Sequence, residues 1–314
     1  MQWGDRIGRR IKLQDMHILL AAVQWGSMAK AADQLAISQP VVSRSIASLE
    51  HTLGVRLLDR SRNGIEPTLY GRALLTHGLA AFNELKQGVK AIEFLTDPTA
   101  GELRIGCGDA AAGLVCAVID QLVRKYPRLL FHVKPGEPPN LQHRELRARD
   151  IDLIVGRLPS ATPADDTETQ TLFYERICVV AGRESPWNRR RKIELAELVD
   201  EPWTLPPPES FPGTLIASAF RACGLDLPRT SATALSIEVG CMLVETERFL
   251  TMLPPGTLLF SASRRRSLKI LSVELPISPW PVGIVALKNR TLSPVAQLFI
   301  DCARKVARPL ANGK

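Results

Sequence analysis

The chain has 314 residues, of which 45% are hydrophobic and 23% are charged. At about 100–200 residues per domain, this length predicts two or three domains, and the composition excludes a wholly disordered chain. The 40 Lys and Arg residues exceed the 32 Asp and Glu residues, so the net charge is +8. A basic chain favours nucleic acid or an acidic ligand as its partner, but its charge says nothing about the fold.

Cysteine usage and the length of the apolar stretches indicate the cellular compartment. Six cysteines, with no C-x-x-C pair, are too few for a disulfide scaffold. The first ten residues lack the apolar core of a signal peptide. Apolar stretches such as Leu114–Ile119 are much shorter than the ~20 residues that cross a bilayer. We therefore expect a reduced, cytoplasmic protein with no membrane partner.

Residues 13–95 have the pattern of one helix after another. Apolar residues recur at helical spacing, while Gly26 and Gly54 are predicted helix ends. Ser27 and Ser38 are predicted N-caps. Two short helices joined by a tight turn form a helix-turn-helix. The first three predicted helices are Leu13–Gln24, Ser27–Leu35 and Ser38–Leu53.

The third predicted helix has an apolar face and a polar face. The expected buried residues are Val41, Val42, Ile46, Leu49 and Leu53. The N-terminal residues of a recognition helix lie at the base edges of the major groove. Gln39 is suited to adenine, Arg44 to guanine, and Ser43 to bases or phosphates. Pro40 is tolerated in the first helical turn. Any one of these residues alone is equally well explained as a solvated surface residue.

A hairpin is predicted directly after this helix. Residues 55–68 have the pattern strand, turn, strand, and Asn63-Gly64 is the strongest two-residue hairpin signal. Such a hairpin next to a helix-turn-helix is a wing. Arg60 and Arg62 lie on it, where they can contact the DNA backbone or the minor groove.

Several of these segments together resemble the LysR-type transcriptional regulators. The resemblance covers nearly the whole chain. It implies that Gln39, Pro40, Ser43 and Arg44 lie at the DNA and that a wing arginine reaches the minor groove. Ser38, at the start of the same helix, is a further candidate DNA contact. Asn63 stands where this family commonly has arginine, so Arg62 takes that role. The segments that carry the resemblance are Trp25–Ile37, Ser38–Arg62, Thr68–Arg72, Gly101–Gly106, Asp150–Gly156 and Leu243–Pro254.

A long helix is predicted over Gly71–Leu95, with a stripe of apolar residues along it. The stripe consists of Leu75, Leu79, Phe82, Leu85, Val89 and Ile92. An isolated helix with such a face needs a partner. A helix buried within its own chain is one interpretation. The resemblance favours an antiparallel pair of linker helices, and hence a homodimer or homotetramer that presents two recognition helices to duplex DNA.

Strand-like and helix-like segments alternate after the breaker stretch Asp97–Gly101, which predicts a mainly parallel α/β sheet. The resemblance implies a two-lobed effector domain of the periplasmic-binding-protein type. The predicted strands are Leu103–Cys107, Leu130–Val133, Ile151–Val155, Ile177–Ala181, Trp203–Leu205, Phe249–Leu253 and Gly283–Leu287. The predicted helices are Gly113–Lys125, Leu141–Arg149, Thr214–Cys223, Ile237–Glu247 and Pro294–Ala307.

A small-molecule effector is expected in the crevice between the lobes, at strand ends and helix N-termini. The candidate contacts are Gly108, Asp109, Ala110, Arg157, Pro207, Pro208, Ser210 and Ser236. The negative charge of Asp109 would repel a carboxylate ligand. We therefore interpret Asp109 as an N-cap rather than a ligand contact. Arg157 supplies a cation. Acidic and sugar-like ligands both remain open.

The sequence and the resemblance together predict an α+β multidomain protein, a DNA-binding transcriptional regulator modulated by an effector. The expected parts are a winged helix-turn-helix over residues 1–70, a linker helix and hinge over 71–98, and an effector domain over 99–314. Lobe I takes about residues 101–173 and 276–314, and lobe II about 174–275. RNA polymerase is a further candidate partner.

Other classes of protein fit the sequence less well. A solute-binding or enzyme-like α/β domain with an incidental N-terminal helical module needs a signal peptide or catalytic residues. The chain has no G-x-S-x-G, H-E-x-x-H, Walker or G-x-G-x-x-G pattern. We therefore expect no enzyme, no cofactor and no metal site. An architectural DNA-binding protein without a ligand and a cysteine-based redox sensor are the remaining alternatives. The runs Arg189–Lys192 and Arg264–Arg266 are interpreted as solvated surface.

Overall fold

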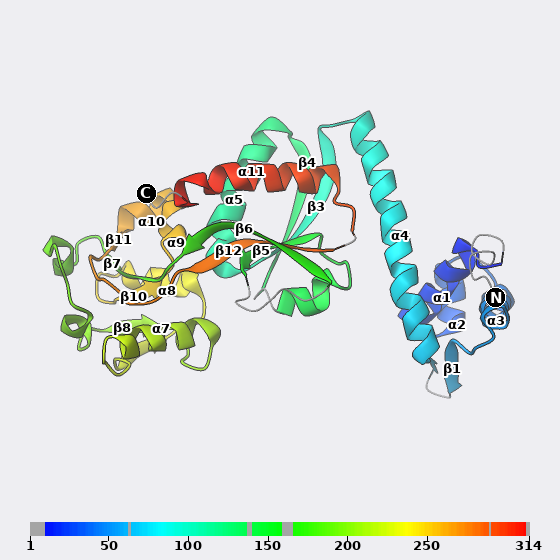
Figure 1. The fold of residues 1–314 in the computed structure, drawn as a ribbon, viewed down its shortest axis with the longest axis horizontal. Helices are drawn as coiled ribbons and strands as arrows, with labels where there is room; N and C mark the ends of the chain where they lie inside the picture. The colour runs from blue at the N-terminus through cyan, green and yellow to red at the C-terminus, as the bar shows by residue number, and fades with distance from the viewer. Residues whose placement is uncertain (1–9, 62–63, 137–139, 159–165, 289, 312–314) are drawn as a thin grey trace. The chain divides into compact units, whose positions relative to one another are not determined.

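The computed structural model describes residues 10–61, 64–136, 140–158, 166–288 and 290–311. The chain divides into two compact units, Met1–Val89 and Lys90–Lys314. Each unit has its own hydrophobic core. Figure 1 shows the order of their elements along the chain.

The first unit packs three short helices, a hairpin and the start of a long helix around one core. Ala31 and Ala32 are buried, so the helices approach closely. Val42, Ile46 and Leu49 form the buried face of the third helix, as predicted, whereas Val41 and Leu53 are half-buried. Its elements are α1 (Leu13–Trp25), α2 (Met28–Gln34), α3 (Gln39–Leu53), β1 (Leu58–Ser61), β2 (Gly64–Pro67) and α4 (Leu69–Thr96), the last of which continues into the second unit.

The predicted glycine helix ends and the predicted N-cap positions of Ser27 and Ser38 are confirmed, but the two serine side chains make no capping hydrogen bond. Gly26 and Gly54 follow α1 and α3 with left-handed backbone, at φ of 65° and 71°. Ser27 and Ser38 occupy N-cap positions, yet neither side chain accepts a capping hydrogen bond. At Ser38 the reason is local: Pro40 has no N–H, and Val41 N–H donates to the backbone carbonyl of Ser38 at 2.9 Å.

The second unit begins with a five-stranded sheet, which with its helices we call lobe I. The strand order is β4-β3-β5-β12-β6. In Figure 1, α5 and α11 lie beside each other against this sheet, and both contribute to the main core. Its elements are β3 (Ala100–Cys107), α5 (Ala112–Lys125), β4 (Arg128–Pro135), β5 (Leu153–Arg157), β6 (Thr167–Glu175), β12 (Trp280–Leu287) and α11 (Pro294–Ala311), with a π-helical segment at Leu141–Leu146.

The rest of the second unit, which we call lobe II, contains β10-β7-β11 and the parallel pair β8-β9. A parallel bridge between Trp203 and Leu250 joins these two sheets. The chain passes between the lobes twice, from β6 to β7 and from β11 to β12. Its elements are β7 (Cys178–Gly182), β8 (Trp203–Leu205), α7 (Phe211–Ala222), β9 (Thr230–Thr233), α8 (Ile237–Val244), β10 (Thr251–Leu253), α9 (Gly256–Leu259), α10 (Ala262–Ser267) and β11 (Leu268–Ile270).

The prediction of a mainly parallel sheet is wrong in part. β4, β3 and β5 are parallel, but β12 is antiparallel to both β5 and β6. In lobe II, β7 is antiparallel to both of its neighbours. The reversal arises because β7 and β12 directly follow a passage between lobes instead of a crossover helix. β6, β9 and β11 were not predicted, and the helix predicted over Leu141–Arg149 is the shorter π-helical segment.

Within the part of the chain that the structure describes, no helix combines the length and the apolar character that a bilayer span requires.

Candidate functional site

The first candidate site is the exposed face of α3. Gln39, Pro40 and Arg44 are exposed and Ser43 is half-buried, on the face opposite the buried residues of the helix. Arg44 Nε donates to the backbone carbonyl of Pro40 at 3.3 Å, which folds the side chain back along its own helix. The exposed side chains of the first two turns therefore include hydrogen-bond donors and acceptors suited to base edges.

Glu50 ties α3 to the hairpin that follows it. Its Oε1 accepts hydrogen bonds from Leu57 N–H at 2.8 Å and from Leu58 N–H at 3.2 Å. Leu57 and Leu58 are buried at the start of β1. One carboxylate near the end of α3 thus fixes where the wing begins.

The hairpin itself is displaced by one residue from the predicted turn. Ser61 pairs with Gly64, so residues 62 and 63 connect the strands and Gly64 belongs to β2. Gly64 has φ of 124°, and a Cβ there would lie 2.8 Å from the carbonyl oxygen of Gly26, so only glycine fits without a shift. Arg60 is exposed on β1, opposite Ile65. Arg62 lies outside the described residues.

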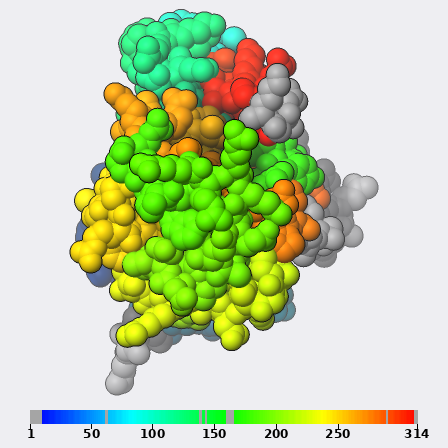
Figure 2. Space-filling view, turned by 90° about the vertical axis from the view of Figure 1, so that its left-hand side faces the viewer, coloured from blue at the N-terminus to red at the C-terminus, as the bar shows by residue number. Residues whose placement is uncertain are grey.

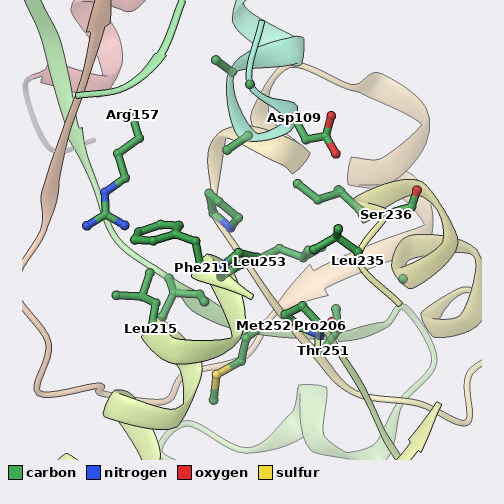
Figure 3. A pocket seen from close by; sticks show the side chains of 18 of the residues that line it. Asp109, Arg157, Pro206, Phe211, Leu215, Leu235, Ser236, Thr251, Met252 and Leu253 are labelled. Atoms are coloured by element: carbon green, nitrogen blue, oxygen red, sulfur yellow. The ribbon is translucent and has the colours of Figure 1, made fainter. Parts of the chain in front are cut away.

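The second candidate site is a cavity of about 360 Å³ in the second unit, lined by residues of both lobes. Figure 3 shows Arg157 and Asp109 on different sides of it, with Phe211 and Leu235 below them in the view. The strand ends of β3, β5 and β8 contribute to its wall, as do Ile177 and Trp280 at the passages between the lobes. This volume lies at the small end of the range typical of small-molecule sites.

Five of the eight predicted effector contacts line this cavity. They are Gly108, Asp109, Ala110, Arg157 and Ser236. Gly108 N–H donates to Val155 O at 3.1 Å, which joins the turn after β3 to β5. Ser236 is the N-cap of α8, and its Oγ accepts from Val239 N–H at 3.4 Å.

The interpretation of Asp109 as an N-cap is wrong. Gly108 holds the cap position of the 3-10 turn Asp109–Ala111, and Asp109 is the first residue within that turn. Its carboxylate is exposed at the cavity and makes no capping hydrogen bond. The carboxylate of Asp109 therefore lies at the wall of the cavity.

The three predicted residues Pro207, Pro208 and Ser210 do not line the cavity. They form the tight turn that starts α7: Ser210 donates through both N–H and Oγ to Pro207 O, at 2.9 and 2.6 Å, and its Oγ accepts from Gly213 N–H at 3.2 Å. Ser210 is thus occupied as a helix cap. Their sequence neighbours Pro206 and Phe211 line the cavity instead.

Sequence reasoning missed most of the apolar wall, because apolar residues in lobe II are not distinguishable from core residues in one sequence. Phe211 is an exception, because the sequence does carry a signal for its place in the wall. It is a large apolar residue at the start of a helix, directly after the predicted contact Ser210. The missed lining side chains include Phe211, Leu215, Leu235, Ile237, Met252, Leu253 and Trp280.

Glu175 is a buried carboxyl at the passage from β6 to β7. Burial raises its pKa to about 7, against the partial counter-effect of a hydrogen bond from Gly256 N–H at 2.9 Å. Its other oxygen, Oε2, has no partner among the described residues. Glu175 does not line the cavity. It holds the backbone of Gly256 through its hydrogen bond.

Four of the thiols, three of them buried and one half-buried, are poorly suited to redox sensing. Burial raises the pKa of Cys107 and of Cys178 to about 12. It also raises the pKa of Cys241 and Cys302. A sensor thiol needs a lowered pKa, because the thiolate is the reactive form.

The basic runs are exposed except for the half-buried Arg264, and they are partly paired. Arg190 bonds Glu197 at 2.8 Å, and Lys192 lies 3.0 Å from Glu194. Arg264 bonds Glu238. Figure 2 looks onto the end of lobe II where the green segment after β7 forms the nearest surface. These pairs fit a solvated surface.

Comparison with known proteins follows the same division of the chain. Residues 13–72 match the family described as bacterial regulatory helix-turn-helix protein, lysR family, and residues 96–308 match the LysR substrate binding domain. The chain is 30% identical over 297 residues to the HTH-type transcriptional regulator GbpR of Azospirillum brasilense, covering 94% of this chain and 86% of that protein.

Solved structures have the same fold. A full-length OxyR variant from Pseudomonas aeruginosa aligns with a TM-score of 0.65 at 20% identity, covering 96% of this chain and 98% of that one. Full-length CbnR in complex with its target DNA aligns with a TM-score of 0.53 at 19% identity, covering 94% and 99%. A helix-turn-helix unit joined to a two-lobed domain defines a class of DNA-binding regulator. The chain belongs to the LysR family of transcriptional regulators, which combine DNA binding with an effector-binding domain.

Proposed function

We propose that the exposed face of α3 carries the sequence readout of this regulator. Gln39, Ser43 and Arg44 contact base edges, with Ser38 and Pro40 beside the backbone at the helix start. The observation that carries this is the division of α3 into a fully buried apolar face and an exposed polar face at its N-terminal turns. Arg60, exposed on the wing, contacts the DNA backbone, and Arg62 takes the minor-groove role.

The cavity between the lobes is the proposed effector site. An effector that binds one arrangement of the lobes better than another shifts the population of arrangements, and so the presentation of α3 to DNA. The proposed parts remain residues 1–70 for DNA binding, 71–98 for the linker and 99–314 for the effector. We place the protein in the cytoplasm, as a homo-oligomer without enzymatic activity, in keeping with relatives that are transcriptional regulators.

DNA binding is tested by titrating the full-length protein with duplexes at several salt concentrations. The target is selected from a random-sequence pool, and a scrambled duplex is the reference. Each neutralised phosphate contributes about −0.9 to the slope of log K against log salt. We expect a steep slope for both duplexes and a preference for the target. A folded protein that binds neither duplex at low salt contradicts the proposal.

Two arginine variants separate the proposed roles. Arg44→Ala should reduce the preference for the target by about 1–3 kcal/mol, because a base contact is lost. Arg60→Ala should weaken both duplexes alike and reduce the slope by about 0.9. Arg124→Ala, exposed on α5 in the other unit, is the control and should bind as the wild type does. An unchanged preference in Arg44→Ala refutes its role.

A further inference from the structure

The two walls of the cavity differ in chemistry. Lobe I supplies both charged side chains, Asp109 and Arg157, together with the backbone of Gly108 and Gly156. Lobe II supplies a largely apolar wall, formed by Phe211, Leu215, Leu235, Ile237, Met252 and Leu253. A ligand that fits both walls has an apolar face and polar groups along its opposite edge.

Arg157 is held in place on the lobe I wall by aromatic rings. Its guanidinium carbon lies 4.1 Å from the ring centre of Phe211 and 5.2 Å from that of Trp280. Contacts with two rings restrict where the guanidinium can lie, and a planar guanidinium recognises a carboxylate better than a flexible ammonium does. Arg157 thus selects one anionic group on the ligand.

Asp109 sets a second requirement on a different side of the cavity. Figure 3 shows its carboxylate directed away from Arg157, on the side of the view where Ser236 also lies. An ionised carboxylate only accepts hydrogen bonds, and it repels another anion. The group that meets Asp109 is therefore a donor, such as a hydroxyl or an amine, separated from the carboxylate that meets Arg157.

The lobe II wall offers few hydrogen-bonding groups to a ligand. Thr251 Oγ1 donates to Thr204 O at 2.8 Å, and Ser236 Oγ already accepts from Val239 N–H. Thr204 is 1% exposed, and its Oγ1 has no partner among the described residues. A polyol with hydroxyls on both faces would leave several of them unpaired against this wall, at a cost for each. This argues against a sugar.

We propose that the cavity binds an apolar monocarboxylate that carries a hydroxyl or amino group at a distance from the carboxylate. The carboxylate binds at Arg157, the donor at Asp109, and the apolar body against lobe II. This inference rests on the proposed function, because it assigns the effector class of that same cavity. It excludes dicarboxylates, since the second charged side chain of the described wall, Asp109, is itself an anion.

The test measures thermal unfolding of the full-length protein with seven probes at equal millimolar concentration. The class is represented by 4-hydroxyphenylacetate and 8-hydroxyoctanoate. Their parents phenylacetate and octanoate lack the donor, 4-hydroxyphenylacetamide lacks the charge, glutarate has two carboxylates and glucose is a polyol. We expect at least one of the two hydroxy acids to raise the midpoint by about 2–4 °C, because a ligand of the native state stabilises it. The other five should raise it by less than half as much.

Two variants test which ligand group binds at Arg157 and which binds at Asp109. Arg157→Gln should abolish the advantage of the acid over its amide, and Asp109→Asn should abolish the advantage of the hydroxy acid over its parent. If the glutamine variant does not fold, Arg157→Lys takes its place. It keeps a cation but loses the planar guanidinium, so it should reduce the advantage of the acid over its amide. Asp120→Asn is the control: it is exposed on α5, bonded to Arg124 at 3.0 Å, and should retain both preferences.

The outcomes distinguish a failure of the proposed ligand class from a failure of the proposed DNA-binding function. A larger shift with glutarate or glucose, or no shift with either hydroxy acid, overturns the ligand class. Retention of the acid-over-amide advantage in Arg157→Gln, or of the hydroxy-acid-over-parent advantage in Asp109→Asn, overturns the contact assigned to that residue. In each of these cases the DNA titration above still reports whether the chain is a DNA-binding regulator, because it requires no ligand.

Discussion

The guanidinium of Arg157, at the end of β5 in lobe I, stacks on the ring of Phe211, the first residue of α7 in lobe II, at 4.1 Å. This contact joins the two lobes at the cavity. Phe211 is 50% exposed, so water reduces but does not abolish the attraction between cation and ring.

We expect this pair to contribute to the stability of the second unit. In a double-mutant cycle, Phe211→Leu and Arg157→Gln should show a coupling of about 0.5–1 kcal/mol, as measured for partly exposed cation–π pairs. The measurement is the urea midpoint of the unit. As the control, Phe211→Leu is combined with Arg176→Gln, an exposed arginine between β6 and β7, and those effects should add. Additivity in the Arg157 cycle would show that the stack contributes nothing.

Glu175 predicts how stability changes with pH. Its pKa in the folded protein is about 7, above the ordinary value of 4.5. The folded state therefore keeps a proton that the unfolded state releases, and the free energy of unfolding falls as pH rises from about 4.5 through 7. A shift of this size corresponds to a loss of up to about 3 kcal/mol.

Glu175→Gln should remove this loss, since glutamine has no proton to release. Wild type and variant should have similar unfolding midpoints at pH 5, and the variant the higher midpoint at pH 8. Glu168→Gln, exposed on the same strand, is the control and should follow the wild type. Parallel pH profiles for wild type and Glu175→Gln would show that Glu175 is not the titrating group.

The hydrogen bonds of Glu50 predict that the stability of the wing depends on α3. Removal of its carboxylate leaves the N–H groups of Leu57 and Leu58 without their acceptor. Glu50→Ala should lower the stability of the first unit by about 1–3 kcal/mol, whereas Glu50→Gln, which keeps an acceptor oxygen, should lose less. Urea unfolding and DNA titration measure the two effects. Equal losses for alanine and glutamine would mean that the charge, not the hydrogen bonds, matters.

The helices of the first unit were predictable because their signals are local. Gly26 and Gly54 end their helices at positive φ, and the period of Val42, Ile46 and Leu49 identifies the buried face of α3. The missed features depend on distant contacts. Asp109 looks like a cap in the sequence, and only the fold shows that Gly108 takes the cap position and leaves the carboxylate at the cavity.

The cavity wall illustrates the same limit. Gly108 and Arg157 were predictable from their places at strand ends. Met252 and Leu253 were not, since an apolar strand residue faces a core or a ligand according to the partner strands. The antiparallel direction of β12 likewise follows from a passage between lobes, which no local pattern marks.

The predicted apolar stripe of α4 divides into two parts in the structure. Leu75 and Phe82 pack against the core of the first unit. Leu85, Val89 and Ile92 are 52%, 54% and 64% exposed. Their spacing of four and three residues places them on one face of the helix, and an exposed face of this kind favours a partner.

We expect fragment 1–98 to form a dimer through this second part of the stripe. Sedimentation at micromolar to high micromolar concentration should show a dimer for the wild-type fragment and a monomer for the double variant Val89→Glu and Ile92→Glu, because burying two carboxylates in an apolar interface is unfavourable. Lys86→Glu together with Glu93→Lys, at exposed positions of the same helix, is the control of equal size and should remain a dimer. A wild-type fragment that stays monomeric throughout would assign the exposed face to some other contact and would contradict pairing through α4.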